Sequence, residues 1–100
     1  MTDSAPIEIR HNEAAHRFEA SLGGALARCD YQRTGNVLRA YHTEVPRAFE
    51  GRGIAAALVS ALLEHADRSG LKVEPACSYV RTYMRRHPES NHLLERGLTL

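Results

Sequence analysis

The chain has 100 residues and a formal net charge of +1, with 43% hydrophobic and 25% charged residues. This length allows one domain with a single core, and the interspersed charges argue against general nucleic-acid binding. No apolar run is long enough to cross a bilayer, and the polar start MTDSAPIE lacks the features of a secretory signal. We therefore expect a cytoplasmic protein in which residues 1–100 form one domain, with no membrane or nucleic-acid partner.

The first half of the chain has the period-two alternation of β-strands. Four such segments follow one another at residues 7–9, 18–22, 25–31 and 37–45. Glycine-containing turns at residues 23–24 and 34–36 provide tight reversals between them. In the fourth segment the alternation places Leu38, Ala40 and His42 on one face, and Arg39, Tyr41 and Thr43 on the other. Sequential strands joined by short turns predict an antiparallel meander.

The second half changes to helical periodicity. A wide apolar stripe begins at Ile54, and Gly70 stands where a C-terminal cap is expected. Residues 71–77 are typical of a short buried strand, and residues 78–86 of a second helix, which ends because Pro88 restricts the residue before it. Pro88 then opens a last helical turn. The predicted order is ββββαβα, an α+β fold with a mostly antiparallel sheet and one parallel strand–helix–strand crossover.

Gly51 and Gly53 stand directly before the first helix, where glycine favours neither a strand nor a helix interior. In such crossovers, ligands bind beyond the carboxyl ends of the strands, at the N-terminus of the connecting helix. Free N–H groups and the helix dipole attract anions there, and Arg52 adds charge. The alternative is a flexible loop before an ordinary helix, because short glycine patterns also arise by chance. No Gly-Lys-Ser/Thr follows, which excludes a mononucleotide P-loop.

The segment VPRAFEGRGIAAAL (residues 45–58) resembles the acyl-CoA-binding segment of the GCN5-related N-acetyltransferases. The signature of that family is Arg or Gln, two residues, Gly, one residue, then Gly or Ala. Gly53 and Ala55 fill the two small positions, and Glu50 stands in place of Arg or Gln. The resemblance implies that acetyl-CoA or CoA is the cosubstrate, with backbone phosphate contacts at the turn. The implied binding residues are Val45, Pro46, Gly51, Arg52, Gly53, Ile54 and Ala55.

A very small branch of that superfamily is more similar still. Its HTEVP, glycine-turn and P-x-C-S-Y-V…HP motifs are found here at residues 42–46, 51–53 and 75–80 with 87–88. The resemblance covers residues 7–94 and implies a shortened fold that lacks the helices which usually follow the first strand and help to form the acceptor site. It implies acetyl transfer to an amine on an unidentified small molecule or protein.

Cys77 is the candidate nucleophile or acid for this chemistry. It lies where the second crossover strand enters its helix, and thiols at helix N-termini ionise more easily than free thiols. The alternative is that Cys77 is a small buried hydrophobic residue, like Cys29 in the middle of its strand. The neighbouring CoA turn and the P-x-C-S-Y pattern favour the catalytic interpretation.

His42 and Tyr79 are the other candidate catalytic residues. His42 is predicted to face the thioester near the carboxyl end of its strand, as the general base or as the group that activates Cys77; the alternative is a satisfied core histidine. Tyr79, near Cys77 at the start of the same helix, is a candidate proton donor to the departing CoA thiolate. Tyr83 is expected to pack against the sheet.

Three arginines near the C-terminus form a basic edge on the second predicted helix. Arg81, Arg85 and Arg86 form either a solvated helix end that the dipole favours or a contact for the 3′-phosphate of CoA, which we assign to Arg86. The other histidines have no partners at metal-ligand spacing, so we predict no metal site. The alternative function is a CoA-binding module or sensor without turnover, which the missing acceptor helices favour. A monomer or weak homodimer is expected, the latter through an exposed sheet edge.

Overall fold

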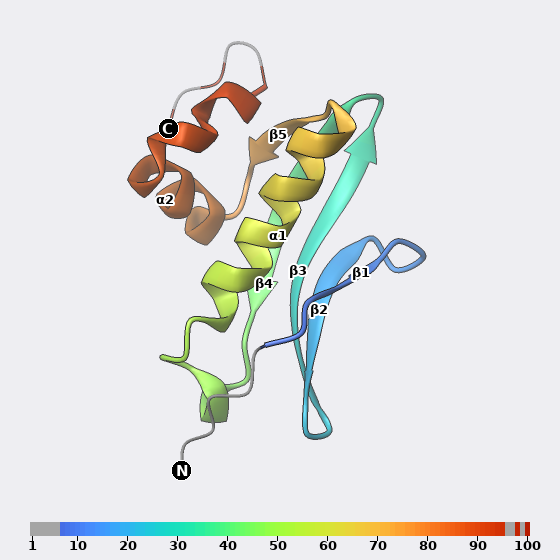
Figure 1. Cartoon of the computed structure of the whole chain (residues 1–100), viewed down its shortest axis with the longest axis vertical. Coiled ribbons are helices and arrows are strands. Elements are labelled where there is room, and N and C mark those ends of the chain that lie inside the picture. The colour runs from blue at the N-terminus through green and yellow to red at the C-terminus, as the bar shows by residue number, and fades with distance from the viewer. Residues whose placement is uncertain (1–6, 96–97, 99) are drawn as a thin grey trace.

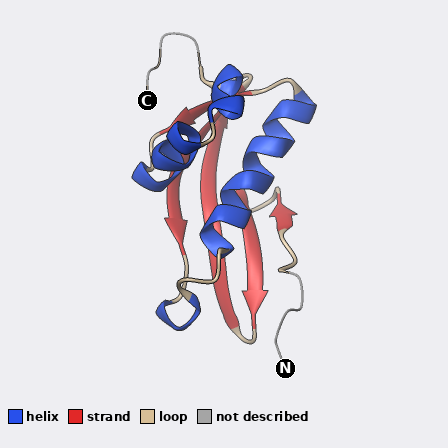
Figure 2. Ribbon diagram, turned by 60° about the vertical axis from the view of Figure 1, so that its left-hand side comes forward, coloured by secondary structure: helices blue, strands red, loops and turns tan. Residues whose placement is uncertain are grey.

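A computed structural model describes residues 7–95, 98 and 100, which form a five-stranded sheet with helices against one face (Figures 1 and 2). The strands, in sheet order, are β1 (Arg10–Asn12), β2 (Arg17–Leu22), β3 (Ala25–Thr34), β4 (Val37–Glu44) and β5 (Lys72–Pro75). The helices are α1 (Ile54–Ser69) and α2 (Ser78–Arg86), with 3-10 helices η1 (Arg47–Phe49) and η2 (Pro88–Leu93). The β4–β5 pair is parallel and the others are antiparallel, so the predicted α+β fold is confirmed. Among the described residues, no helix is long and apolar enough to span a bilayer.

The core lies between the sheet and the helices. The apolar stripe predicted for α1 is buried, and it meets the inward side chains of β3 and the buried Val80 and Met84 of α2. Gly70 ends α1 in the left-handed conformation (φ 71°), with its N–H directed to the carbonyls of Ala66 and Asp67. α1 therefore ends at the glycine that the sequence predicted as its C-terminal cap. With this end fixed, the length of α1 determines which part of β4 lies beside its N-terminus.

The first strand differs from the prediction. β1 begins at Arg10, whereas the alternation indicated a strand at residues 7–9. The pairing is set opposite Phe18, because the His11 ring stacks on the Phe18 ring with centroids 4.1 Å apart. Ile9 packs against the core from outside the strand. A stacked cross-strand pair thus decides the register, and a short apolar alternation does not.

A bulge in β4 changes which side chains face the core. Tyr31 pairs with Ala40 and Asp30 with His42, so Tyr41 is an extra residue without a partner on β3. One extra residue reverses the alternation that follows it. The prediction that His42 shares the face of Leu38 and Ala40 is therefore wrong. Beyond the bulge Thr43 points toward the core, and His42 points to the opposite face of the sheet.

No helix of the described residues covers the other face of the sheet (Figure 2), and that face carries a network of charged side chains. Arg28 bridges Asp30 at 2.9 Å and Glu44 at 3.2 Å, and Arg39 approaches Glu74 at 3.6 Å. Glu19 is the most covered member, with 3% of its surface exposed, because arginine side chains from β1 and β2 lie over it. The hydrogen bond from Arg10 contributes most to lowering the pKa of Glu19, and the hydrogen bond from Arg17 contributes next. Together they lower this pKa from 4.5 to about 2.

We predict that Glu19→Gln destabilises the fold and makes its free energy of unfolding less dependent on pH in acid. The folded-state pKa lies below the unfolded one, so the Glu19 carboxylate stabilises the fold above about pH 4.5, and this stabilisation is lost as the pH falls toward about 2. At neutral pH the variant should lose about 1–3 kcal/mol in urea unfolding, with a smaller difference near pH 2.5. The exposed pair of Glu64 and Arg68 provides the control, because Glu64→Gln should change stability by less than about 0.5 kcal/mol. A difference for Glu19→Gln that does not shrink in acid would contradict this assignment.

Candidate functional site

The N-terminus of α1 presents free backbone N–H groups to open space. Gly53 is its N-cap at φ 77°, and Gly51 has φ 81°, both in the left-handed region that favours glycine. No side chain of the described residues caps this end, and the N–H of Ala57 is the first to bond within the helix, to the Gly53 carbonyl at 3.0 Å. The N–H groups of Ile54, Ala55 and Ala56 therefore have no intrahelical partner. A Cβ built on Gly51 or Gly53 would have nothing within 4 Å, so the space over the turn is open.

A pocket of about 240 Å³ lies at this turn. It is lined by Val45, Phe49, Glu50, Gly51, Gly53, Ile54, Ala55, Ala56 and Tyr79. Most of the residues that the sequence predicted for CoA binding are in this set, together with the candidate proton donor. The pocket thus joins three segments: the chain that leaves β4, the glycine turn, and the first turn of α2.

Three of the predicted binding residues do not line this pocket. Pro46 is the N-cap of η1, and its carbonyl accepts the Phe49 N–H at 2.8 Å. The guanidinium carbon of Arg52 lies 5.3 Å from the centre of the Phe49 ring, so its charge stays beside the turn. Arg86 is exposed in the last turn of α2. A role for each of the three in phosphate binding remains a prediction.

The outer half of β4 has an open edge beside α2. The β4–β5 ladder ends where Ala40 pairs with Pro75, and the N–H of Cys77 then donates to the Ala40 carbonyl at 2.8 Å. β4 continues to Glu44, and no described strand pairs with this side of residues 41–44. Alternate N–H and C=O groups along this stretch are therefore available to an extended ligand. The stretch leads from Cys77 to Val45 and the glycine-turn pocket.

Cys77 lies in a cluster of two thiols and one hydroxyl. It is the half-buried N-cap of α2, and its thiol donates to Thr43 Oγ1 at 3.6 Å. The Thr43 hydroxyl donates in turn to Cys29 Sγ, also at 3.6 Å. Cys29 is fully buried, and this burial raises its pKa to about 11, so it remains a neutral thiol near pH 7. Thr43 was not among the predicted site residues, because uninterrupted alternation along β4 would place its side chain on the opposite face of the sheet.

His42 does not join this cluster. Its Nε2 lies 3.1 Å from Glu44 Oε1 on the face that no helix covers, and this hydrogen bond, followed by the charge of Arg28, lowers the pKa of Glu44. The side chains of His42 and Thr43 thus lie on opposite faces of one strand. The structure brings Cys77 together with a hydroxyl and places the candidate base across the sheet.

Tyr79 lies at the start of α2, as predicted, and it also lines the pocket at the glycine turn. Partial burial raises its pKa, the nearby Tyr83 adds to this shift, and Arg86 opposes it. The phenol therefore keeps its proton at neutral pH. It is suited to donate a hydrogen bond or a proton to a group in the pocket.

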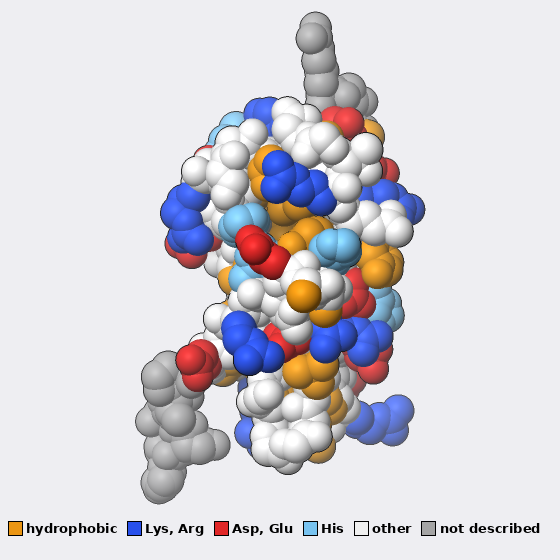
Figure 3. Space-filling model, turned by 90° about the vertical axis from the view of Figure 1, so that its right-hand side faces the viewer, with side chains coloured by type: hydrophobic (Ala, Val, Ile, Leu, Met, Phe, Trp, Pro, Cys, Tyr) orange, Lys and Arg blue, Asp and Glu red, His pale blue; other side chains and the backbone are white. Residues whose placement is uncertain are grey.

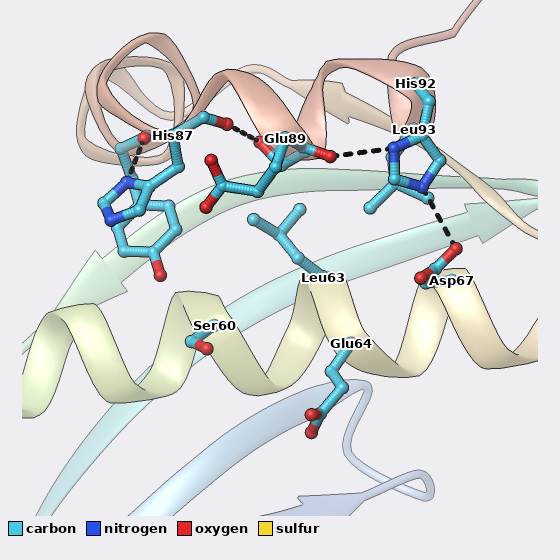
Figure 4. A pocket seen from close by; sticks show the side chains of 10 residues that line it. Ser60, Leu63, Glu64, Asp67, His87, Glu89, His92 and Leu93 are labelled. Atoms are coloured by element: carbon cyan, nitrogen blue, oxygen red, sulfur yellow. Dashed lines mark hydrogen bonds and ion pairs between the residues drawn. The ribbon is translucent and has the colours of Figure 1, made fainter.

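A second pocket, of about 190 Å³, lies between α1 and η2 (Figure 4). There His92 Nε2 meets Asp67 Oδ1 at 3.1 Å, and His87 stacks on the Tyr83 ring with centroids 3.9 Å apart. His87 Nδ1 also lies 2.7 Å from the Tyr83 carbonyl oxygen. These contacts fasten η2 to the helices, and none of the predicted site residues lies in this pocket.

Histidines also gather on the side that β1 and β2 form (Figure 3). His11 Nε2 lies 2.6 Å from the Tyr31 hydroxyl, and its ring meets the His65 ring edge-on at 4.5 Å. Burial lowers the pKa of His11, and the nearby His65 adds to this shift. The cluster joins β1 to α1. Across the described part of the chain, no group of three or more His, Cys, Asp or Glu residues is arranged to hold a metal ion.

Comparison with known protein sequences identifies the family of this chain. A sequence profile described as GCN5-related N-acetyl-transferase matches residues 17–93, which include the glycine turn, both cysteines and Thr43. The chain belongs to this family. The GCN5-related chain is also 31% identical to Protein NATD1 of Homo sapiens over 96 residues, which cover 93% of this chain and 85% of that protein. Protein NATD1 of Xenopus tropicalis is 32% identical, with coverages of 93% and 88%.

A solved structure shows the same architecture. The solution NMR structure of a GCN5-like protein from Staphylococcus aureus matches with a TM-score of 0.72 and 26% sequence identity. The match covers 93% of this GCN5-related chain and 91% of that one. The overall fold of this chain is thus shared with an experimentally determined structure.

Proposed function

We propose that this chain binds acetyl-CoA at the glycine turn and transfers the acetyl group to an amine acceptor, with Cys77 as the acetyl carrier. The observation that supports this most is the turn itself. Two left-handed glycines hold uncapped helix N–H groups toward open space, and the open edge of β4 leads from there to Cys77. Family membership adds the expectation of an acyl-CoA ligand.

The pyrophosphate of CoA would be held by backbone groups. The N–H groups of Ile54, Ala55 and Ala56, together with the dipole of α1, favour an anion at this end of the helix. Glu50 lines the same pocket, and its carboxylate opposes this attraction, whereas Arg52 beside the turn offsets it. Binding therefore depends on the backbone geometry of the turn more than on any single side chain.

The pantetheine arm would extend along β4. Its amide groups match the spacing of an added strand, and the unpaired edge at residues 41–44 offers the backbone partners. This path brings the thioester from the glycine turn toward Cys77 at the N-terminus of α2. The helix N-terminus there favours the negative charge that develops on an oxyanion nearby.

The transfer would have two steps. In the first, the Cys77 sulfur attacks the acetyl carbonyl carbon, the bond to the CoA sulfur breaks, and the CoA thiolate takes a proton, which the Tyr79 phenol is placed to deliver. The proton that Cys77 loses replaces the one that Tyr79 gave. In the second step an amine attacks the acetyl-cysteine thioester and releases the amide, and the amine proton returns to the Cys77 thiolate. Cys77 ends as the thiol that it was at the start.

His42 fits one of its two predicted roles better than the other. The bulge turns it away from Cys77, which speaks against a direct role in activating the thiol. An acceptor that approaches over the face without helices would meet His42 first. We therefore assign His42 the role of taking the extra proton from an incoming ammonium group, so that the amine is neutral before it attacks and the proton released in the attack goes to the Cys77 thiolate.

A CoA-binding module or sensor without turnover is the second candidate. The observation in its favour is that the Cys77 thiol is hydrogen-bonded to the Thr43 hydroxyl, and no histidine or carboxylate among the described residues is hydrogen-bonded to that sulfur. Binding would then occur without acetyl transfer. Both candidate functions use the glycine turn to bind CoA, and they differ in whether Cys77 accepts the acetyl group.

The binding part of the proposal is tested with two glycines of matched geometry. Gly53 and Gly70 cap opposite ends of α1 at φ 77° and 71°. Alanine at either position should cost a similar stability, about 1–2 kcal/mol, because the left-handed conformation strains any side chain. Only Gly53→Ala should also weaken acetyl-CoA binding, by about tenfold in isothermal titration, because its Cβ enters the space over the turn. Equal affinities for the two variants, or no heat with the wild type at millimolar acetyl-CoA, would contradict the site.

The transfer part is tested by intact-protein mass spectrometry after incubation with acetyl-CoA. The wild type should gain one acetyl group, and Cys29→Ala should gain it as well, because Cys29 is buried and keeps its proton. Cys77→Ala should gain none while it still binds CoA. If the wild type binds acetyl-CoA but neither forms an adduct nor releases CoA when amines are present, the binding module is the correct function.

A further inference from the structure

The Thr43 hydroxyl lies between two sulfurs and has one hydrogen to donate. In the described structure it donates this hydrogen to Cys29 Sγ and accepts the hydrogen of the Cys77 thiol, both at 3.6 Å. The three side chains come from three elements, β3, β4 and the N-cap of α2, so residues far apart in the sequence meet at one point. A threonine here is not required by strand packing alone, because valine has nearly the same shape.

The backbone around the cluster is held firmly. Thr43 is paired directly with Cys29 in the β3–β4 ladder, just beyond the bulge at Tyr41. The N–H of Cys77 is bonded to the carbonyl of Ala40. Threonine is also stiff about χ1, because it is branched at Cβ. The position of the hydroxyl oxygen is therefore fixed, and rotation of its hydrogen is the main freedom that the cluster retains.

Loss of the Cys77 proton changes which sulfur is the better acceptor. The thiolate is a charged acceptor, and hydrogen bonds to charged groups are about twice as strong as neutral ones. Cys29 stays a neutral thiol, because its full burial raises its pKa to about 11. The Thr43 hydrogen is then drawn from Cys29 to Cys77.

We propose that Thr43 is a positioning residue for Cys77, which orients the thiol in the resting state and turns its hydroxyl from Cys29 to the Cys77 thiolate when the proton leaves. This inference rests on the proposed function, in which Cys77 carries the acetyl group. It deepens that function, because it names the group that stabilises the nucleophile in the absence of a histidine or carboxylate partner. Cys29 has a part as well: it competes for the same hydrogen and restrains the reactivity of Cys77.

The competition predicts that removing the Thr43 hydroxyl and removing the Cys29 sulfur have opposite effects on the reactivity of Cys77. Removing the hydroxyl leaves the Cys77 thiolate without its donor, so Cys77 should react more slowly with an alkylating reagent. Removing the Cys29 sulfur leaves the hydroxyl hydrogen without its resting acceptor, so Cys77 should react faster. A purely structural role for the cluster would loosen the site in both variants and would move both rates in the same direction.

The experiment measures alkylation of Cys77 by iodoacetamide as a function of pH, without CoA. Trypsin separates the two cysteines into residues 29–33 and 73–81, so that mass spectrometry follows each thiol by itself. Near neutral pH the rate for Thr43→Val should fall about fivefold, and Thr43→Ser should stay within about twofold of the wild type. Cys29→Ala should raise the rate about twofold. The difference in alkylation rate between Thr43→Val and the wild type should disappear in alkaline solution, where the thiol is ionised in both proteins.

The outcomes separate this inference from the proposed function. Unchanged alkylation in Thr43→Val, no rescue by serine, or a slower rate in Cys29→Ala would overturn the role of Thr43. If Thr43→Val does not fold, as thermal unfolding would show, the serine and Cys29→Ala rates decide by themselves. Because the assay contains no acetyl-CoA, the expected pattern together with a wild type that forms no acetyl adduct would keep the role of Thr43 and reject the carrier role of Cys77.

Discussion

The bulge at Tyr41 is the constraint on which the site depends. One residue inserted into β4 reverses the alternation beyond it, so that Thr43 points inward to the cysteines and His42 points outward to Glu44. At the same point the carbonyl of Ala40 accepts the N–H of Cys77, which anchors the start of α2. A regular strand would place His42 against the core and would leave the Cys77 thiol without the hydroxyl.

The sheet separates the two halves of the proposed chemistry. The helices lie on one face (Figure 1). In the proposed binding mode, the glycine turn, the open edge of β4 and Cys77 follow one another from the phosphate end of CoA to its thioester end. The opposite face carries His42 among paired charges, and no helix in the described part of the chain lies over it. Acetyl-CoA and the amine would then approach Cys77 from different sides, and the acceptor would meet an open surface.

Much of this arrangement was predictable from the sequence, because the deciding signals are local. The caps of α1, the turn glycines and the proline after α2 each act within a few residues, and the structure has the predicted fold and element order. The bulge was not predictable, since Tyr41 satisfies the alternation as well as any residue, and its insertion is visible only in the pairing with β3. Thr43 was missed and His42 was misplaced for this one reason. β1 was displaced because the stacking of His11 on Phe18 outweighs the alternation at residues 7–9.

The proposed acetyl transfer depends most on the position of CoA along the glycine turn and the open edge of β4. The direct measurement is a titration of the ¹⁵N-labelled protein with CoA, followed by amide chemical shifts. The largest changes are expected at the N–H groups of Ile54, Ala55 and Ala56 and along residues 41–44, with little change around the pocket between α1 and η2. No shifts at millimolar CoA, or shifts centred on His87 and His92, would contradict the account.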